Sequence, residues 1–325
     1  NFSALLWYPV SAAEQGAMAP DGLRSTGSPF PQWSAPSAVT PTNRSPHLTT
    51  LKPSPITWSN LILPEAALAD CQYLAQRVQC QRQVDEGWGF ADLGVAQTGT
   101  LVVLAGQAGT GKTTVVRAIA HDLGVAITCV DLAVTPPHQY GQVLADLWAI
   151  APQPPLDPSQ SAIADPDDGE ISVILIQSAH LWLSASAGLL TTELHPFLRH
   201  CRQQPGLVLW EVEQAERVAP QWLEYMDQVI SLPLPGEGDR LRLWKMACGG
   251  GVPLAPRFDF KRLSKLDLTG GQIYQLARDG AIAAAASGGK LTLDLIQRAL
   301  ERRGYDRVLR QFHASRTRKS RKQVP

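Results

Sequence analysis

The stretch LVVLAGQAGTGKTTVVRAIAHDLG, residues 101–124, contains an apolar run, a glycine-rich loop and an amphipathic segment, in that order. The apolar run is bounded by glycines and has the length of a buried parallel strand. The last part carries apolar side chains at helical spacing and stops at Gly124, a residue type that commonly ends helices. A strand before the loop and a helix after it predict a phosphate-binding loop rather than a chance match in a turn. The loop matches the motif GxxxxGK[ST] at Gly106, Gly111, Lys112 and Thr113.

The predicted loop has the chemistry of a nucleotide site. Its glycines allow backbone N–H groups to converge on phosphate oxygens, and the positive end of the following helix adds to the attraction. Lys112 is expected to reach the β and γ phosphates, and Thr113 to place its hydroxyl on Mg²⁺. We therefore expect ATP and Mg²⁺ as ligands. The expected contact residues are Gly106, Gln107, Ala108, Gly109, Thr110, Gly111, Lys112, Thr113 and Thr114.

Strand and helix patterns alternate along the chain around this loop. Such alternation implies an α/β fold in which helices cover both faces of a parallel sheet, here a P-loop sheet of five strands. The helix before the fourth strand contains Pro196, which predicts a kink or a split there. The further strands are expected at residues 125–132, 171–177, 206–212 and 228–234, and helices at 65–84 and 138–151. Only helices are expected after residue 235, at 238–248, 258–266, 271–286 and 292–313.

Composition divides the chain into four parts. Residues 1–57 are rich in Pro, Ser, Thr and Gly and lack an apolar period, so we expect a disordered leader. The α/β nucleotide-binding domain is expected at 58–235 and a helical lid domain at 236–313. The tail, residues 314–325, contains the basic run RTRKSRK. This run is either a solvated segment or a docking site for an acidic partner or nucleic acid.

The overall composition indicates a globular protein without a strong charge of either sign. Of the 325 residues 44% are apolar, and 29 basic side chains balance 29 acidic ones. Such a balance argues against attraction of the whole protein to nucleic acid or to an anionic membrane. The five cysteines lack a CxxC pair, no apolar run is long enough to span a membrane, and the first residues do not resemble a signal peptide. We therefore expect a cytoplasmic protein with reduced cysteines.

The strand at residues 171–177 ends without the acids that P-loop ATPases carry there. One such acid holds Mg²⁺ through water, and in many of these enzymes a second acid polarises the attacking water. Gln177 and Ser178 occupy these places, and they supply neither charge nor a general base near neutral pH. Loss of one such group commonly lowers the rate by a factor of about 10² to 10³. Binding should survive, whereas turnover should suffer.

An alternative source of negative charge lies on the neighbouring strand. Glu211 and Glu213 stand at the end of the strand predicted at residues 206–212. If one of them faces the loop, it replaces the missing acid. If neither does, both are surface or salt-bridged glutamates.

Several stretches of the sequence resemble AAA+ ATPases, from about residue 58 to residue 312. Besides the loop, APQWLEYMDQVISLPLPGEGDRLRLWKMA, residues 219–247, is similar to the family's connection between the last strand and the lid. LTGGQIYQLARDGAIAAAA, residues 268–286, resembles the lid segment in which Gly271 approaches the nucleotide. WSNLILP and EGWGF are similar to a bacterial subgroup that includes AAA+ ATPases encoded beside contractile injection systems.

The resemblance implies an ATP site between the α/β domain and the lid, ATP hydrolysis, assembly into homo- or hetero-oligomeric rings, and remodelling of a protein client. The sequence departs from the family at two further catalytic places. Glu213 stands where a polar residue usually orients the attacking water, a position termed sensor 1. The place of the arginine finger reads Leu223, Glu224 and Tyr225. An arginine there stabilises charge in the transition state, and a glutamate has the wrong sign.

Three hypotheses follow. The first is an ATP-binding regulatory or structural subunit of the AAA+ type with little hydrolysis. The second is a weak but active AAA+ ATPase that remodels a protein partner, with Gln177 and Glu213 sharing the metal and water duties. The third is another P-loop phosphotransferase, such as a small-molecule kinase.

Overall fold

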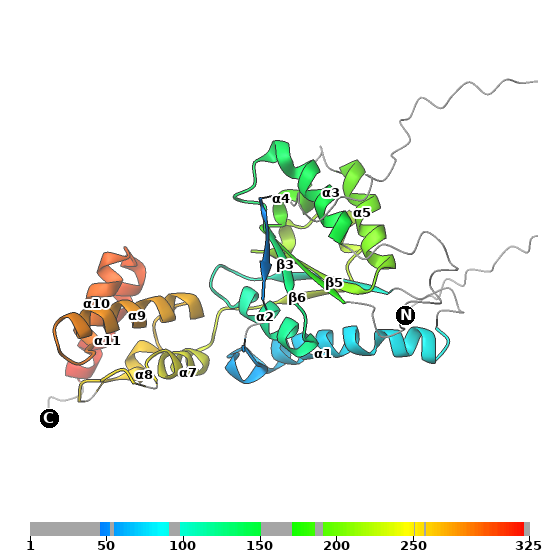
Figure 1. Ribbon diagram of the computed structural model, residues 1–325. Coiled ribbons are helices and arrows are strands. Elements are labelled where there is room, and N and C mark those ends of the chain that lie inside the picture. The colour runs from blue at the N-terminus through cyan, green and yellow to red at the C-terminus, as the bar shows by residue number, and fades with distance from the viewer. Residues whose placement is uncertain are drawn as a thin grey trace, which may run out of the picture. The chain divides into compact units, whose positions relative to one another are not determined.

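A six-stranded sheet forms the centre of the α/β part of the protein (Figure 1). The computed structural model describes residues 46–52, 55–90, 98–150, 171–185, 191–249, 251–256 and 258–321. The strand order is β1-β3-β4-β5-β2-β6. The strands are β1 (Leu48–Leu51), β2 (Gly99–Ala105), β3 (Ile127–Asp131), β4 (Ser172–Gln177), β5 (Gly206–Val212) and β6 (Gln228–Ser231). The last five are mutually parallel, which confirms the predicted α/β class and the five-stranded parallel sheet.

Strand β1 was not expected from the sequence. It pairs antiparallel with β3 at the sheet edge, with Leu48 opposite Val130 and Leu51 opposite Ile127. Residues 48–51 fall in the stretch for which we expected no regular structure, and that expectation is wrong for them. Four residues between prolines are too few to show a period, and their pairing depends on the exposed edge of β3. Residues 1–45 and 53–54 of the expected leader lie outside the described residues.

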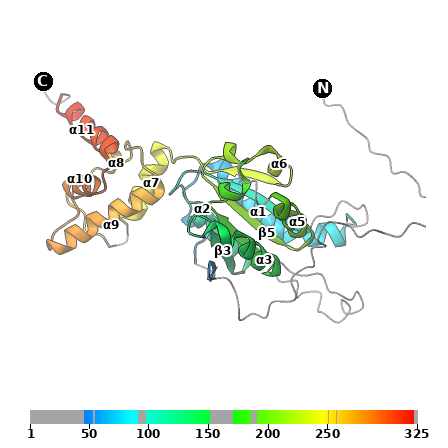
Figure 2. The same cartoon turned by 90° about the horizontal axis from the view of Figure 1, so that it is seen from above.

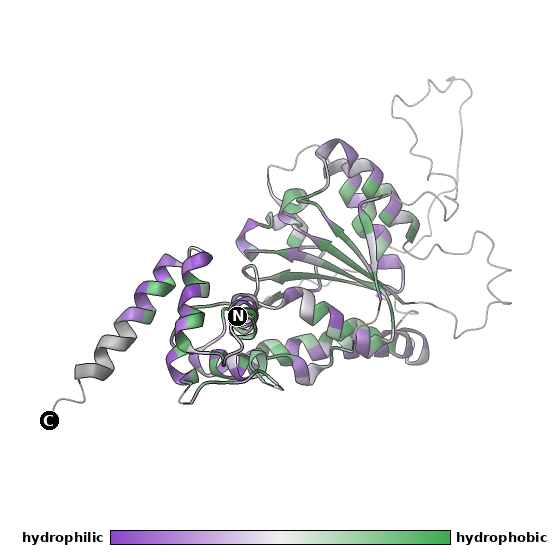
Figure 3. Ribbon diagram, turned by 60° about the vertical axis from the view of Figure 1, so that its left-hand side comes forward, coloured by the Kyte–Doolittle hydropathy of each residue, from purple (hydrophilic) through white to green (hydrophobic). Residues whose placement is uncertain are grey.

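Helices cover both faces of the sheet. Leu101 and Val103 of β2 point into the core beneath one face, while Val102 and Leu104 point into the other. This alternation explains why a central strand consists of an unbroken apolar run, and Figure 3 shows the centre of the sheet as mostly hydrophobic. One face carries α1 (Glu65–Arg82) and α2 (Lys112–Leu123). The other carries α3 (Tyr140–Ile150), α4 (His180–Leu183), α5 (Thr191–Gln203) and α6 (Pro220–Leu223).

Helix α5 runs through Pro196, so of the two predicted outcomes, a kink or a split, the split is wrong. Pro196 lacks the N–H that would bond to the carbonyl of Thr192, so the helix loses one backbone hydrogen bond at this point. The next residues, Phe197 and Leu198, are fully buried in the core beneath this face. Their burial keeps the helix on the sheet.

The helices after β6 pack around a core of their own and group together in two views of the molecule (Figure 2). Gly304 adopts a left-handed φ of 66° and ends the first part of the helix expected at 292–313. That stretch therefore forms two helices, and the second extends into the residues that we assigned to the tail. The elements are α7 (Glu237–Ala247), α8 (Phe260–Leu263), α9 (Gly270–Ala286), α10 (Leu293–Arg302) and α11 (Asp306–Arg321). Within the described ranges no helix has the length and apolarity needed to cross a bilayer.

A buried carboxylate at the start of β6 ties three elements together. Asp227 accepts a hydrogen bond from the backbone N–H of Leu101 at 2.9 Å and one from Arg77 of α1 at 2.8 Å. Arg202 of α5 lies 3.6 Å from the same carboxylate. The Asp227 side chain is only 9% exposed, so its charge depends on these partners.

We expect Asp227→Asn to lower the free energy of unfolding by about 2–4 kcal/mol, because the amide leaves two arginines without their counter-ion. The matched control is Glu213→Gln, which removes the exposed ion pair with Arg217 and should cost less than about 1 kcal/mol. Urea unfolding followed by tryptophan fluorescence measures both. Equal losses in the two variants would show that Asp227 does not hold these elements together.

Candidate functional site

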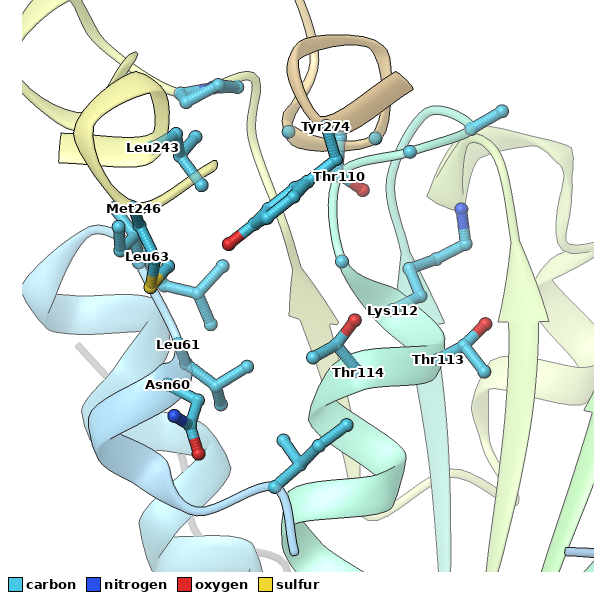
Figure 4. Close-up of a pocket in the computed structure, with 18 of the residues that line it drawn as sticks. Asn60, Leu61, Leu63, Thr110, Lys112, Thr113, Thr114, Leu243, Met246 and Tyr274 are labelled. Atoms are coloured by element: carbon cyan, nitrogen blue, oxygen red, sulfur yellow. The ribbon is translucent and has the colours of Figure 1, made fainter. Parts of the chain in front are cut away.

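A cavity of about 750 Å³ lies against the glycine-rich loop (Figure 4). Residues 108–114 form one wall, and Figure 4 shows Lys112, Thr113 and Thr114 there. The segment before α1 forms a second wall with Asn60 and residues 61–64. The helical domain contributes the third wall through α7 and α9. Its lining residues are Leu243, Met246, Gly270, Gly271 and Tyr274.

The loop between β2 and α2 has a fixed conformation. Thr110 bonds back to the carbonyl of Gln107 through both its N–H, at 3.2 Å, and its hydroxyl, at 2.9 Å. Gly109 and Gly111 have φ values of 81° and 106°, which side-chain-bearing residues rarely adopt. Gly111 is the N-cap of α2, so the helix begins at Lys112 with its unpaired N–H groups at the cavity. The sequence prediction of a strand, a loop and a helix is confirmed here.

The first turn of α9 packs directly on the tip of this loop. The N–H of Gly271 donates to the carbonyl of Gly109 at 2.9 Å. A Cβ atom on Gly109 would lie 2.6 Å from the hydroxyl oxygen of Thr269, and one on Gly271 would lie 3.1 Å from the Cα of Gly109. The two backbones can approach this closely only because both residues are glycines. The structure thus brings Gly271 to the loop, as the resemblance implied.

The ammonium group of Lys112 is buried and faces protein oxygens. It donates to the carbonyl of Gly106 and, at 3.1 Å, to that of Gln107. It also lies 3.5 Å from Oε1 of Glu211, and only 5% of its side chain is exposed. Burial of an ammonium group is costly unless such partners surround it.

Glu211, rather than Glu213, is the acid at the cavity. Glu211 lines it from β5, and its Oε2 accepts a hydrogen bond from Nε2 of Gln177 at 3.2 Å. Glu213 follows the last residue of β5, its side chain is 55% exposed, and it lies 3.8 Å from Arg217. Two residues apart on one strand, both side chains would point to the same face of the sheet. The strand ends at Val212, between them, so only Glu211 has the orientation that the strand imposes. Glu213, which we placed among the catalytic positions, therefore does not line the cavity, whereas Glu211 does.

The side chain of Gln177 is bonded to two protein partners. Besides its bond to Glu211, its Oε1 accepts a hydrogen bond from the Cys129 thiol at 3.3 Å. Burial, followed by the charges of Glu211 and Asp131, raises the pKa of Cys129 to about 11. The thiol therefore stays protonated near neutral pH and can act as this donor. Gln177 is not among the residues that line the cavity.

Ser178, at the second expected acid position, also faces the protein. Its hydroxyl donates to Oδ1 of Asp131 at 2.9 Å. Its φ of 57° makes it the one non-glycine residue with a left-handed backbone among those described, which is a strained conformation for serine. The Ser178 hydroxyl is thus directed at the Asp131 carboxylate and is not placed to act as a base. It does not line the cavity either.

The region expected to hold an arginine finger is engaged in internal contacts. Nε of Arg202 donates to the carbonyl of Tyr225 at 3.0 Å. The Tyr225 hydroxyl is hydrogen-bonded to Nδ1 of His195 at 2.9 Å. Leu223 and Tyr225 pack against the core, and Glu224 is the exposed residue between them.

The oxygen donors available to a magnesium ion are few. Thr113 and Glu211 both line the cavity, and a hydroxyl with one carboxylate is a donor set that Mg²⁺ accepts when phosphates and water complete it. No group of three or more His, Cys, Asp or Glu side chains in the described ranges could hold a metal ion without a ligand.

Sequence reasoning missed the apolar part of the site. Tyr274 follows Gly270 by one helical turn of α9, so helical spacing alone places it on the face that meets the loop. Leu61 and Leu63 precede α1, where no periodic pattern marks them. Met246 lies on α7, in a stretch noted only for its resemblance. None of these residues carries a motif that identifies it in isolation.

Comparisons with solved structures give the class of the fold. The chain is similar to the crystal structure of the FIGL-1 AAA domain, with a TM-score of 0.55 and 16% identity over 79% of this chain and 86% of that one. It is also similar to the FIGL-1 AAA domain in complex with ADP, with a TM-score of 0.56 and 17% identity over 79% and 87% of the two chains. The sequence matches no protein-family model and no curated protein. The protein therefore has the fold of an AAA domain.

We expect Gly109→Ala to lower stability by more than the strain of about 1–2 kcal/mol that a left-handed alanine carries, because its Cβ also collides with Thr269. Gly124→Ala is the matched control, since Gly124 has a φ of 71° and open space around its would-be Cβ. Thermal melting compares the two losses. Hydrogen exchange should speed up at the first turn of α9 in Gly109→Ala alone. The same exchange in both variants would mean that this contact does not hold α9 on the loop.

Proposed function

We propose that this protein binds ATP at the cavity beside the glycine-rich loop and hydrolyses it little, serving as a regulatory or structural subunit. The observation that carries the proposal is the preformed loop, with Lys112 buried at its centre and the start of α2 behind it. N–H groups at a helix start, together with a lysine, form a site for phosphate oxygens. The similar FIGL-1 AAA domain has been solved in complex with ADP, which supports a nucleotide as the ligand.

The walls of the cavity suit the two ends of such a ligand. Loop residues 106–114 would bind the phosphates through backbone N–H groups. Leu61, Leu63, Met246 and Tyr274 lie across the cavity from Thr113 and Thr114 (Figure 4). An apolar wall with one aromatic ring is a suitable surface for a flat base.

Thr113 and Glu211 are the residues that would hold Mg²⁺ with the phosphates. The metal neutralises phosphate charge when bound, and the protein contributes a hydroxyl and one carboxylate to its surroundings. This carboxylate comes from β5, which the sequence analysis named as an alternative source, rather than from β4. Gln177 supports it through the hydrogen bond to Oε2.

Low hydrolysis follows from what surrounds the place of the attacking water. Gln177 and Ser178 carry no acid, and their polar atoms are bonded to Cys129, Glu211 and Asp131. Each missing catalytic group lowers the rate by a factor of about 10² to 10³. Binding without turnover can order the helical domain against the loop. It can also complete a homo- or hetero-oligomeric ring that acts on a protein client.

A second candidate function is slow ATP hydrolysis by a protein remodeller. The position of Glu211 favours it, because this carboxylate lies at the cavity and is hydrogen-bonded to the residue in the usual acid position. Phosphate release separates the two candidates. A rate well above background that is lost in Glu211→Gln supports the second, and a rate at background supports the first.

We expect saturating ATP with Mg²⁺, at about 100 times the dissociation constant, to stabilise the protein by about 2.7 kcal/mol, or roughly 5–10 °C in Tm. Lys112→Ala should abolish this shift, because the phosphates lose the charge that binds them. The exposed Lys265→Ala is the matched control and should keep the shift. Differential scanning fluorimetry measures the shift in all three proteins. Absence of any shift in the unmodified protein at millimolar ATP would contradict the proposal.

A further inference from the structure

The pair formed by Lys112 and Glu211 has a consequence for which form of the nucleotide the site accepts. A lysine ammonium has three N–H donors. Two of them are directed at the carbonyls of Gly106 and Gln107, and the carboxylate of Glu211 is the remaining partner, with Oε1 at 3.5 Å. A phosphate oxygen that approaches this ammonium therefore competes with partners that are already there. The carboxylate is the partner with the same charge as the phosphate.

Glu211 is held where it competes. Its side chain is 17% exposed, and Gln177 fixes the second carboxylate oxygen from the neighbouring strand. β5 lies between β4 and β2 in the sheet, with Glu211 paired in register to Leu104, two residues before the loop begins. The carboxylate thus comes from a strand whose backbone is held on both sides by neighbouring strands.

Displacement of Glu211 from Lys112 leaves a carboxylate beside a triphosphate. The negative charges of the carboxylate and of an adjacent phosphate repel strongly in a partly buried site. Thr113 and Glu211 offer oxygen ligands at the same cavity, so a divalent cation placed between them and the phosphates would give both negative groups a positive partner. The Glu211 carboxylate therefore repels metal-free ATP, whereas a bound cation removes this repulsion from the metal complex.

We propose that Glu211 acts as an internal competitor of the triphosphate for Lys112, so that the site takes ATP as its divalent-cation complex and rejects metal-free ATP. This inference rests on the proposed function. It makes Glu211 a specificity-determining residue for the charge state of the ligand. ADP, which lacks the γ phosphate, is affected less.

The test is isothermal titration calorimetry of the full chain with ATP and with ADP, each in EDTA and in excess Mg²⁺. Glu211→Gln removes the charge and keeps the size of the side chain. We expect it to bind ATP in EDTA about tenfold more tightly than the unmodified protein, and ADP in EDTA less than about threefold more tightly. Addition of Mg²⁺ should therefore increase the ATP affinity of Glu211→Gln less than it increases that of the unmodified protein. Glu213→Gln is the matched control and should leave all four affinities unchanged.

A second variant guards against an effect of misfolding. Glu211→Asp keeps the charge but withdraws it by one methylene, so its affinity for metal-free ATP should lie between those of the unmodified protein and Glu211→Gln. Unfolding curves in the absence of nucleotide show whether each variant is folded. If both variants are folded and bind metal-free ATP no more tightly than the unmodified protein, the inference is overturned.

The failure of this inference can be told apart from the failure of the proposed function. If the unmodified protein and Glu213→Gln bind ATP, Lys112→Ala does not, and Glu211→Gln matches the unmodified protein, only the role of Glu211 is refuted. If the unmodified protein binds neither nucleotide under any condition, both proposals are refuted together.

Discussion

The ion pair between Lys112 and Glu211 is the interaction on which the rest of the site depends. Lys112 sits at the first turn of α2, where the loop glycines and the helix start already favour anions, and a buried ammonium there requires a negative or carbonyl partner. Glu211 and the loop carbonyls provide it. Gln177, at the expected acid position, in turn donates a hydrogen bond to Glu211. Polar contacts therefore connect the end of β4, β5 and the glycine-rich loop.

The sheet order determines which residues can belong to that group. β5 lies between β2, which leads into the loop, and β4, which ends at Gln177. In a parallel sheet the carboxyl ends of adjacent strands meet at one edge, and ligands bind there. A carboxylate at the end of β5 therefore lies at the same cavity as one at the end of β4 would. The contact of Gly271 with Gly109 then brings the helical domain to this edge and supplies the apolar wall.

The sequence was sufficient for features that depend on local pattern. The loop, α2 and the five parallel strands could be predicted from the spacing of glycines and from apolar runs. Each of these patterns lies within a single loop, helix or strand. Strand β1 could not be predicted, because its four residues gain their structure from the edge of β3. Glu211 and Glu213 could not be told apart either, since the difference lies in where β5 ends. The wall formed by Tyr274 required the packing of α9 on the loop.

We propose that the site binds a triphosphate and lacks the groups that would cleave it. A crystal structure of the protein grown for days with ATP and Mg²⁺ tests both parts at once. We expect an intact γ phosphate on residues 106–114, with the Glu211 carboxylate separated from the Lys112 ammonium and turned toward the metal. Density for ADP alone, or a loop without any nucleotide, would contradict it.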